Sequence, residues 1–490
     1  MNASPPRSKT GIPGLDDILN GGFLSNRIYL VEGDPGSGKT TLAVQYLLEG
    51  RKNGEKGLYL TLSETKEELI AGAASHGWSL DGIEIVELVP RETDLSADDN
   101  LTMFNPSEVE LSETTRAVLA AVEQNKPSRV VFDSLSEMRL LAQSSLRYRR
   151  QILALKQFFI GRQCTVLLLD DGTSEGPDLQ LQSIAHGVVS LSQSAPNYGA
   201  ERRRLRVVKF RGTKYRGGYH DFSIAHEGLQ VFPRLIAAEH RSDFDFAFIE
   251  SGVPRLDALL GGGIDRGTST LFLGPAGSGK STVAIQYAVA AAKRGEHAAV
   301  FAFDESARTL VKRSEALGLT FTEGTGPGMI ALRQVDPTEM SPGEFTHLVR
   351  TSVERDHATV VVIDSLNGYM NAMPEERDLI AQLHEMLTYL GSQGVSTIMV
   401  VAQHGLLGQN VAAPVDTTYL ADSVILFRFF ENAGKVRKAV SVIKKRSGFH
   451  EDTIRELCTG ANGIQLSEPL ENFHGVLSGN PLAIRSTPPT

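Results

Sequence analysis

The sequence predicts an α/β fold that occurs twice in tandem, each copy a mostly parallel sheet with helices on both faces and an antiparallel C-terminal extension. Three observations support this prediction. A glycine-rich octet occurs in each half, continuous apolar runs of strand length alternate with helical stretches, and each half closes on hairpin-like strands. At 490 residues the chain is also too long for one ordinary hydrophobic core.

The two glycine-rich octets are GDPGSGKT at residues 33–40 and GPAGSGKS at residues 274–281. Each follows an apolar strand-length run and precedes a stretch with apolar residues at helical spacing. This is the sequence motif of a phosphate-binding P-loop, in which backbone N–H groups surround a polyphosphate, the lysine reaches the β/γ oxygens and the hydroxyl ligates Mg²⁺. The predicted ATP-binding residues are Gly33, Gly36, Ser37, Gly38, Lys39, Thr40 and Thr41 in the first half, and Gly274, Gly277, Ser278, Gly279, Lys280, Ser281 and Thr282 in the second.

The segments around the octets repeat as well. Residues 10–22 match residues 251–263, at the same distance before the lysine in both halves. Such agreement indicates gene duplication and sets the domain limits. We expect a first P-loop domain over residues 1–238, a linker over 239–248, a second domain over 249–470 and a tail over 471–490.

Acidic residues follow two further apolar runs in each half. The runs 57–64 and 298–305 end in Ser63-Glu64 and in Asp304-Glu305, and the runs 129–134 and 359–365 contain Asp133 and Asp364. The latter two are the expected second acidic motif of a P-loop ATPase. We predict that Asp133 with Thr40, and Asp364 with Ser281, hold the Mg²⁺ ion and its water shell. Fourth strands are expected at 165–169 and 396–401.

Composition limits the functional classes. With 41% apolar and 22% charged residues, no run long enough to cross a membrane and no apolar stretch at the start, the chain is expected to be cytoplasmic with no membrane partner. The net charge of −9 argues against nucleic acid as a partner. Cys164 and Cys458, far apart in sequence, are expected to be reduced core residues.

Basic residues recur near the end of each half. The strand-like runs 204–212 and 438–448 carry Lys209 and Arg211, and Lys444 and Arg446. Taken with the repeated opening, the paired P-loops and the strand-ending acids, these residues make the chain resemble the KaiC family of circadian-clock ATPases from about residue 8 to 482.

The resemblance implies a pair of RecA-like domains that assemble as a nucleotide-dependent homohexamer, with ATP at every subunit interface. On this interpretation Lys209 and Arg211 reach the neighbour's first-domain nucleotide, and Lys444 and Arg446 its second-domain nucleotide. Without the repetition these four residues would read as solvated charges at strand ends.

The resemblance also assigns the acids after the second strand to catalysis. Glu64 in the first domain, and Asp304 and Glu305 in the second, are expected to orient the attacking water or hydroxyl. Ser63 replaces one carboxylate of the first pair. General-base assistance is commonly worth about 10²–10⁴ in rate, so slower turnover is expected at the first site unless Glu64 works alone.

Neighbouring serine and threonine phosphoacceptors characterise the second domain of the clock protein. Their positions fall on Thr418 and Tyr419 here, with Thr417 as a shifted substitute. The resemblance thus implies serine/threonine autokinase activity, with a role in signalling or regulation. After residue 481 only 482–490 remain, so the family's long activating tail is cut short and regulation by the partner clock protein is not expected.

Two other functional classes stay open. A RecA- or helicase-like DNA-dependent ATPase would need basic loops facing a channel; residues 139–150 are the most basic stretch, whereas residues 368–377 of the second half are acidic. Alternatively, nucleotide binding drives assembly of a scaffold that signalling partner proteins recognise.

Overall fold

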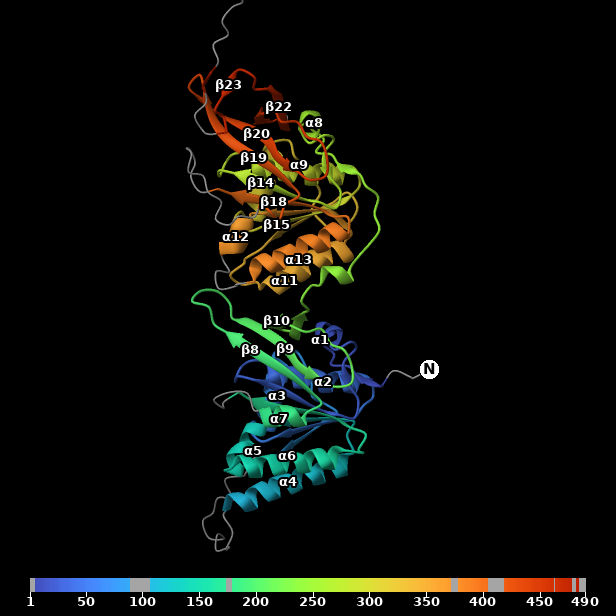
Figure 1. Ribbon diagram of the computed structural model, residues 1–490. Coiled ribbons are helices and arrows are strands. Elements are labelled where there is room, and N and C mark those ends of the chain that lie inside the picture. Colours follow the sequence, from blue (N-terminus) through green and yellow to red (C-terminus); the bar gives the residue numbers. More distant parts are fainter. Residues whose placement is uncertain are drawn as a thin grey trace, which may run out of the picture. The chain divides into compact units, whose positions relative to one another are not determined.

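The computed structural model describes residues 5–88, 106–172, 179–371, 378–403, 418–461, 463–477 and 482–483. The chain divides into two compact units, Met1–Arg234 and Leu235–Thr490, and the described part of each contains a nine-stranded sheet (Figure 1). The predicted fold class, two tandem α/β domains of RecA-like type, is confirmed.

The first sheet has the strand order β11-β10-β9-β8-β3-β7-β6-β4-β5. Its strands are β3 (Ile28–Gly33), β4 (Gly57–Thr61), β5 (Ile83–Glu87), β6 (Arg129–Asp133), β7 (Thr165–Asp171), β8 (Gly187–Ser194), β9 (Arg202–Phe210), β10 (Tyr219–Ala225) and β11 (Gly228–Phe232). Pairing is parallel from β5 through β8 and antiparallel from β8 through β11. The carboxyl ends of β3, β4, β6 and β7 therefore meet at one edge, where α/β folds bind ligands.

Helices cover both faces of this sheet. They are α1 (Pro13–Ile18), α2 (Lys39–Lys52), α3 (Lys66–Ser75), α4 (Pro106–Asn125), α5 (Leu135–Ala142), α6 (Ser145–Phe159) and α7 (Leu179–Ile184). One apolar core joins α1, α2 and α3 to one face, and a second joins α4 to α7 to the other. A strand buried on both faces must be apolar throughout, which explains the continuous runs in the sequence.

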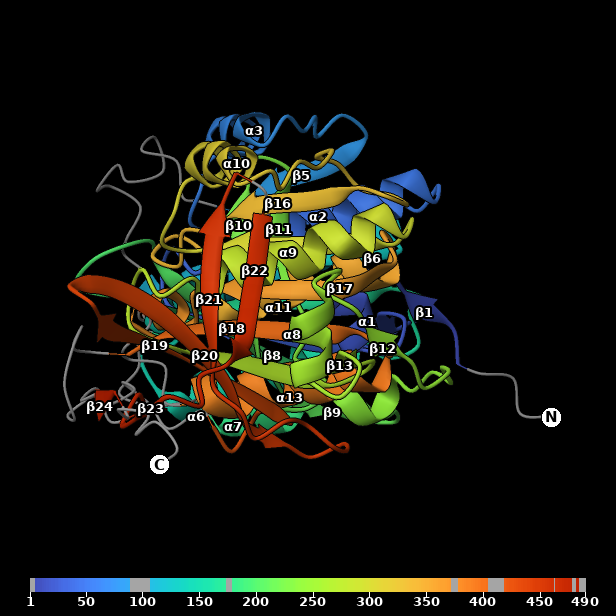
Figure 2. The same cartoon turned by 90° about the horizontal axis from the view of Figure 1, so that it is seen from above.

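The second sheet repeats the first, in the order β16-β15-β17-β18-β14-β19-β20-β21-β22. Its strands are β14 (Ser269–Gly274), β15 (His297–Ala302), β16 (Ile330–Gln334), β17 (Ala358–Asp364), β18 (Ser396–Ala402), β19 (Ser423–Asn432), β20 (Lys435–Lys445), β21 (Arg455–Gly460) and β22 (Gly463–Pro469). Figure 2 shows the antiparallel strands β20, β21 and β22 of the extension in red.

Its helices also lie on both faces. They are α8 (Pro254–Leu259), α9 (Lys280–Lys293), α10 (Ala307–Ala316), α11 (Pro342–Glu354), α12 (Leu366–Asn371) and α13 (Leu379–Ser392). Residues of α8, α9 and α10 share one core, and residues of α11, α12 and α13 share the other. Three short ribbons complete the described structure: β1 (Arg7–Ser8) with β2 (Phe23–Leu24), β12 (Phe248–Ile249) with β13 (Ile264–Asp265), and β23 (Phe473–His474) with β24 (Leu482–Ala483).

The repeated opening of each half has a structural reason. Asp16 accepts hydrogen bonds from the backbone N–H and the hydroxyl of Thr10 at 2.9 and 2.8 Å, and Asp257 accepts one from the Ser251 backbone N–H at 2.7 Å. The aspartate thus ties the first turn of α1 or α8 to the chain that enters it. The same turn therefore occurs at the start of both units.

Several segments outside the sheets are more ordered than the sequence suggests. Residues 239–248, the expected linker, belong to the second unit and contact the end of α13: the Ser392 hydroxyl donates to His240 O and the Ser242 backbone N–H to Ser392 O at 3.2 Å. In the expected tail, Val476 is buried beside Phe430. Cys164 is buried as expected, but Cys458 is exposed; that expectation was wrong because alternate residues of the two-stranded β21–β22 edge face solvent.

Candidate nucleotide-binding sites

The first P-loop connects β3 to α2 and encloses the lysine. Gly38 adopts the left-handed conformation, with φ of 99°, and α2 begins at Lys39. The Lys39 ammonium is buried and donates to Gly33 O at 2.8 Å and Asp34 O at 2.9 Å, and it pairs with Asp171 Oδ1 at 2.8 Å. The Ser37 hydroxyl is buried without a hydrogen-bond partner among the described residues.

The strand-end acid of the first unit lies beside the P-loop hydroxyl. The Thr40 hydroxyl donates to Asp133 Oδ2 at 3.2 Å, and the Tyr59 hydroxyl donates to the same oxygen at 2.5 Å. Burial raises the pKa of Asp133, although these two hydrogen bonds act against the shift. The structure therefore brings Thr40 and Asp133 together, as expected for a metal-binding pair.

Glu64 stands on the turn that follows β4. The Thr61 hydroxyl donates to Glu64 O at 2.7 Å, and Thr65 caps α3 in a capping box with Glu68. Burial, then the charge of Asp133, raises the pKa of Glu64. The turn thus carries a partly buried carboxylate close enough to Asp133 for the two charges to interact.

A cavity of about 380 Å³ adjoins this carboxylate. Its lining comes from the start of α2, the turn after β4 and the helix α3: Thr40, Thr41, Val44, Ser63, Glu64, Glu68, Leu69, Gly72, Ala73, Ser75, His76 and Trp78. The His76 and Trp78 rings lie 4.8 Å apart at the far side. A ligand held at the P-loop has room to extend between α2 and α3.

The second P-loop repeats the geometry with one difference at the lysine. Gly279 is left-handed, with φ of 105°, and the Lys280 ammonium donates to Gly274 O at 2.8 Å and to Pro275 O at 2.6 Å. Burial lowers the pKa of Lys280 to about 8. Among the described residues, no carboxylate forms an ion pair with it.

The predicted metal-binding pair of the second unit, Ser281 and Asp364, also lies together. Burial raises the pKa of Asp364, and a side-chain hydrogen bond with Ser281 opposes the shift. The Ser365 hydroxyl donates to Asp304, so that carboxylate is fixed against the residue that follows β17. Both acids therefore lie at the carboxyl ends of adjacent strands, β15 and β17.

Glu305 differs from Glu64 in its partner. Arg313 of α10 grips both Glu305 oxygens, at 3.2 and 2.7 Å, and also donates to the Thr282 hydroxyl at 3.1 Å. Arg313 and Gly72 each lie eight residues after the glutamate of their unit. Gly72 has no side chain and lines the first cavity, whereas Arg313 occupies the corresponding place. Sequence reasoning missed this arginine, although the aligned repeats contain the signal.

The basic residues lie at the opposite edge of each sheet. The Arg211 backbone N–H donates to His186 O, and the backbone N–H of His186 donates to Ile28 O at the start of β3. Lys209 donates to Gln182 O and Arg211 to Ser183 O at 3.2 Å, both at the end of α7. The structure does not bring Lys209 and Arg211 to the P-loop of their own unit.

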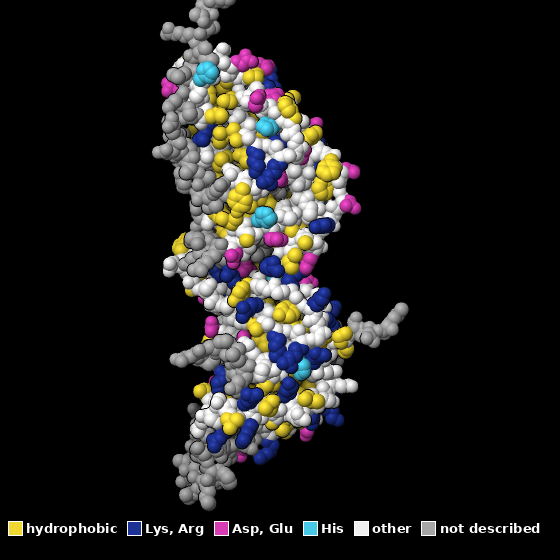
Figure 3. Space-filling model, in the orientation of Figure 1, with side chains coloured by type: hydrophobic (Ala, Val, Ile, Leu, Met, Phe, Trp, Pro, Cys, Tyr) yellow, Lys and Arg dark blue, Asp and Glu magenta, His cyan; other side chains and the backbone are white. Residues whose placement is uncertain are grey.

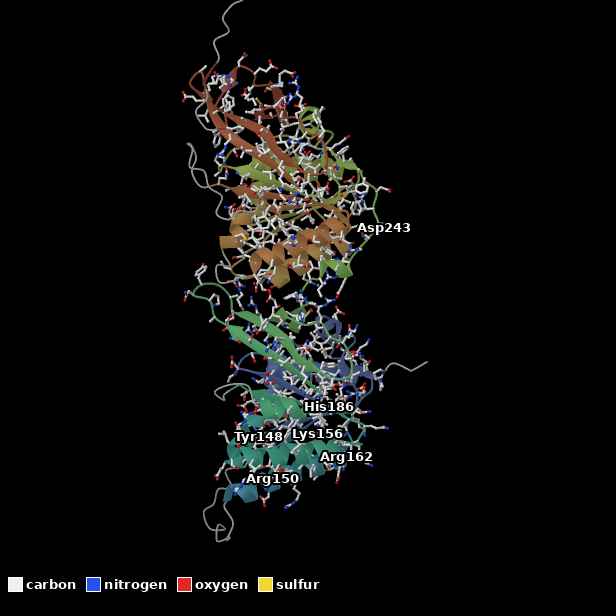
Figure 4. All side chains as sticks on the ribbon, viewed as in Figure 1. Tyr148, Arg150, Lys156, Arg162, His186 and Asp243 are labelled. Carbon is white, nitrogen blue, oxygen red and sulfur yellow. The ribbon has the colours of Figure 1, made fainter. Side chains whose placement is uncertain are left out.

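Positive charge gathers around these two residues. Burial lowers the pKa of Lys209, and Arg211 and Lys156 lower it further; burial and Lys156 likewise lower the pKa of His186. Figure 3 shows several dark-blue Lys and Arg side chains close together on the lower part of the face in view. In Figure 4, Lys156 of α6 lies beside His186.

Lys444 and Arg446 occupy the corresponding edge of the second sheet. Lys444 donates to Thr418 O at 2.9 Å, and Arg446 donates to Tyr419 O at 3.1 Å. The expected acceptor Thr418 is therefore next to both basic residues. Thr417 lies outside the described residues.

The most basic stretch forms helices instead of a loop. Residues 139–150 belong to α5 and α6 and the turn between them, and Arg139 pairs with Asp170 at 2.7 Å. Of residues 368–377, the structure describes only 368–371, in α12. Among the described residues, these two stretches therefore give no support to the basic channel loops that a DNA-dependent ATPase would need.

Comparison with known families agrees with this arrangement. A model of the KaiC ATPase domain matches the chain twice, over residues 8–236 and 249–471. The chain belongs to the KaiC ATPase family. Each of the two matches covers one P-loop together with its acids and its basic strand end.

Curated members of the KaiC family align over nearly the whole chain. The circadian clock protein KaiC3 of Synechocystis is 26% identical over 486 residues, which cover 97% of this chain and 94% of that protein. The circadian clock oscillator protein KaiC of Picosynechococcus is 26% identical over 484 residues, covering 97% and 92%. That of Prochlorococcus marinus is 26% identical over 482 residues, covering 96% and 95%. None of the helices in the described ranges has the length and apolar character needed to span a bilayer.

Proposed function

We propose that this KaiC-family protein is a Mg²⁺-dependent ATPase with two unequal sites per chain, and that its second domain is also a serine/threonine autokinase. The observation that carries the proposal is the repeated juxtaposition of a buried P-loop lysine with a hydroxyl–aspartate pair. Lys39 lies beside Thr40 and Asp133, and the second unit repeats the arrangement with Lys280, Ser281 and Asp364.

The residues present fit Mg²⁺. Thr40 and Asp133 supply hard oxygen ligands 3.2 Å apart, and the unpaired Ser37 hydroxyl leaves a buried polar atom for a ligand. Mg²⁺ is usually held by one or two protein oxygens together with water and phosphate, so a larger protein cluster is not required. When bound, the ion would neutralise charge on the phosphates.

Catalysis then depends on the acids near each P-loop. In the first site Glu64, whose pKa is raised by burial, would orient the attacking water. In the second, Asp304 and Glu305 would orient water or a protein hydroxyl. Because Arg313 already binds both oxygens of Glu305, Asp304 is the better placed of the two to accept a proton.

We further propose that the basic strand ends act on the nucleotide of a neighbouring chain in a homohexamer. Lys209 and Arg211 lie at the start of β3, whereas the P-loop follows its end. Six residues of strand separate the two edges, a distance of about 16 Å, too far for direct contact with their own unit's phosphates. The clustered positive charge around Lys209 supports an anion partner.

The same argument supports Thr418 as the proposed phosphoacceptor. Thr418 precedes β19, which runs parallel to β14, so it lies at the edge away from its own P-loop. Lys444 and Arg446 contact residues 418 and 419 directly. A neighbour's nucleotide bound by these two residues would meet the Thr418 hydroxyl, which supports phosphoryl transfer between chains.

Nucleotide binding by single lysine variants tests the proposal. Lys39→Ala and Lys280→Ala should each abolish one of two ATP-binding events, measured by calorimetry, while Lys52→Ala, an exposed change on α2, should preserve both. Undiminished binding in both single variants would refute the proposed sites. Sizing with and without ATP, combined with phosphopeptide mapping of Thr417, Thr418 and Tyr419, tests the hexamer and the autokinase; ATP-dependent assembly without phosphorylation would leave the scaffold interpretation.

A further inference from the structure

The two P-loop lysines use their hydrogen-bond donors differently. A lysine ammonium has three N–H donors. Those of Lys39 are matched by Gly33 O, Asp34 O and Asp171 Oδ1, at 2.8, 2.9 and 2.8 Å. Those of Lys280 meet two carbonyl oxygens among the described residues, Gly274 O and Pro275 O. Lys280 thus keeps one donor for a phosphate oxygen, and Lys39 must exchange a partner to bind one.

The register of the two sheets locates the cause of this difference. Gly33 pairs with Asp171 across β3 and β7, and Gly274 pairs with Ala402 across β14 and β18. Asp171 and Ala402 therefore hold the same position in the duplicated unit. A carboxylate beside the first lysine is replaced by a methyl group in the second.

Neighbouring side chains hold Asp171 in place. The Ser136 hydroxyl donates to Asp171 Oδ2 at 2.9 Å, and the Ser134 hydroxyl lies 3.4 Å from the same oxygen. In the second unit Asn367 instead binds the backbone of Ala402, donating to its oxygen and accepting from its N–H, at 2.9 and 2.7 Å. In the first unit these side chains bind the carboxylate of Asp171, whereas in the second unit Asn367 binds only the backbone of Ala402.

A second difference between the units is the serine at position 63, where the second unit has Asp304. The serine after the strand-end aspartate contacts one carboxylate in each unit: Ser365 contacts Asp304 from β15, and Ser134 contacts Asp171 from β7. In the sheet order, β7 and β15 lie on opposite sides of the strand that ends in the aspartate, which is β6 in the first unit and β17 in the second. The first unit thus has Ser63 where the second has Asp304, and Asp171 where the second has Ala402.

We propose that Asp171 competes with the nucleotide phosphates for the Lys39 ammonium and thereby lowers the affinity of the first site for ATP. The inference rests on the proposed function of the first P-loop as an ATP site. The Lys39 ammonium is buried while the Asp171 carboxylate is 29% exposed, so the buried lysine favours its partner, and the negative charge of Asp171 also repels an incoming polyphosphate. Its consequence is that the two sites fill at different ATP concentrations.

The protonation state of Asp171 supports competition near neutral pH. Burial acts to raise the pKa of this carboxyl, but the hydrogen bond and charge of Lys39, with the bonds from Ser136 and Ser134, hold it below its usual value. The carboxylate is therefore charged under ordinary conditions. It does not withdraw by taking up a proton.

Equilibrium binding of a fluorescent ATP analogue to the full chain tests the proposal. Lys280→Ala isolates the first site, and adding Asp171→Asn, which keeps the shape and removes the charge, should tighten binding about tenfold, the value of one charge-assisted hydrogen bond. Asp171→Ala provides a second neutral variant. AMP, which lacks the phosphates that Lys39 reaches, should compete equally well with and without the substitution.

The second unit supplies the reciprocal experiment. In a Lys39→Ala chain, Ala402→Asp should weaken ATP binding about tenfold, while Ala402→Asn should leave it unchanged. Unchanged or weaker ATP binding in both Asp171 variants, or equal tightening of AMP, overturns the competition. If the Lys280→Ala chain binds no ATP, both the proposed function of the first site and this inference are wrong. If that chain binds ATP but neither Asp171 variant binds it more tightly, only the inference is wrong.

Discussion

Arg129 offers a stability prediction whose size follows from its contacts. The side chain is 1% exposed at the start of β6 and donates to Tyr46 O at 2.6 Å, Lys9 O at 2.7 Å and Glu55 Oε2 at 2.5 Å. It thereby ties the P-loop helix α2 and the N-terminal segment to the strand that ends in Asp133. Removing one partner of a buried ion pair typically costs about 3–5 kcal/mol.

We expect Arg129→Met to lower the free energy of unfolding of the first unit by about 3–4 kcal/mol. The methionine keeps most of the volume but removes the guanidinium donor from the buried contact with Tyr46 O and the part-buried contact with Lys9 O. The cost falls toward the lower end because Glu55 is 35% exposed and can rehydrate. For a unit of this size the melting temperature should fall by about 10 °C.

The single tryptophan makes this measurable in the full chain. Trp78 is the one tryptophan in the sequence and belongs to the first unit, so its fluorescence during denaturation reports that unit alone. Arg51→Met is the matched control: Arg51, on α2, likewise donates to two carbonyl oxygens, but at the surface, and its replacement should cost under about 1 kcal/mol. An equal loss in the two variants would refute the reasoning.

Three further predictions concern the first unit, with stability followed by Trp78 fluorescence. Burial lowers the pKa of His220 from 6.5 to about 4. The neutral imidazole therefore stabilises the fold fully above pH 6.5, and this stability is lost as the pH falls toward 4, by about 3 kcal/mol. His220→Gln should remove this part of the acid sensitivity. Glu64→Gln should lower first-site turnover by about 10²–10⁴ without weakening ATP binding, measured in a chain whose second site is inactivated; unchanged turnover would exclude the glutamate as the base. Gly228→Ala should destabilise more than Gly54→Ala, because both have positive φ but only the first new Cβ would meet Trp78, at 2.4 Å.

Much of the fold could be predicted because its determinants are local. The octets, the apolar runs of β3, β6, β14 and β17 and the helical spacing after each lysine specify strand, loop and helix within a few residues. Duplication then fixed the domain count. The strand-end positions of Asp133 and Asp364 followed from the same pattern, since parallel strands end at a common edge.

The partners of the charged residues could not be predicted in this way. Nothing in the sequence near Glu305 or Glu64 states that one carboxylate is gripped by an arginine and the other faces a cavity; Arg313 and Gly72 become meaningful only once α10 and α3 are packed beside the P-loops. Likewise, Arg129 reads as a surface charge at a strand end until α2 covers it.

The sequence by itself determined that this chain contains two KaiC-like P-loop domains with a lysine, a hydroxyl and a strand-end acid in each. Only the tertiary structure decided that the domains are electrostatically different: Lys39 pairs with Asp171, whereas the equivalent strand position in the second unit is Ala402. The physical reason is that covalent spacing sets helix and strand periodicity, whereas an ion pair depends on which strands become neighbours and in which register.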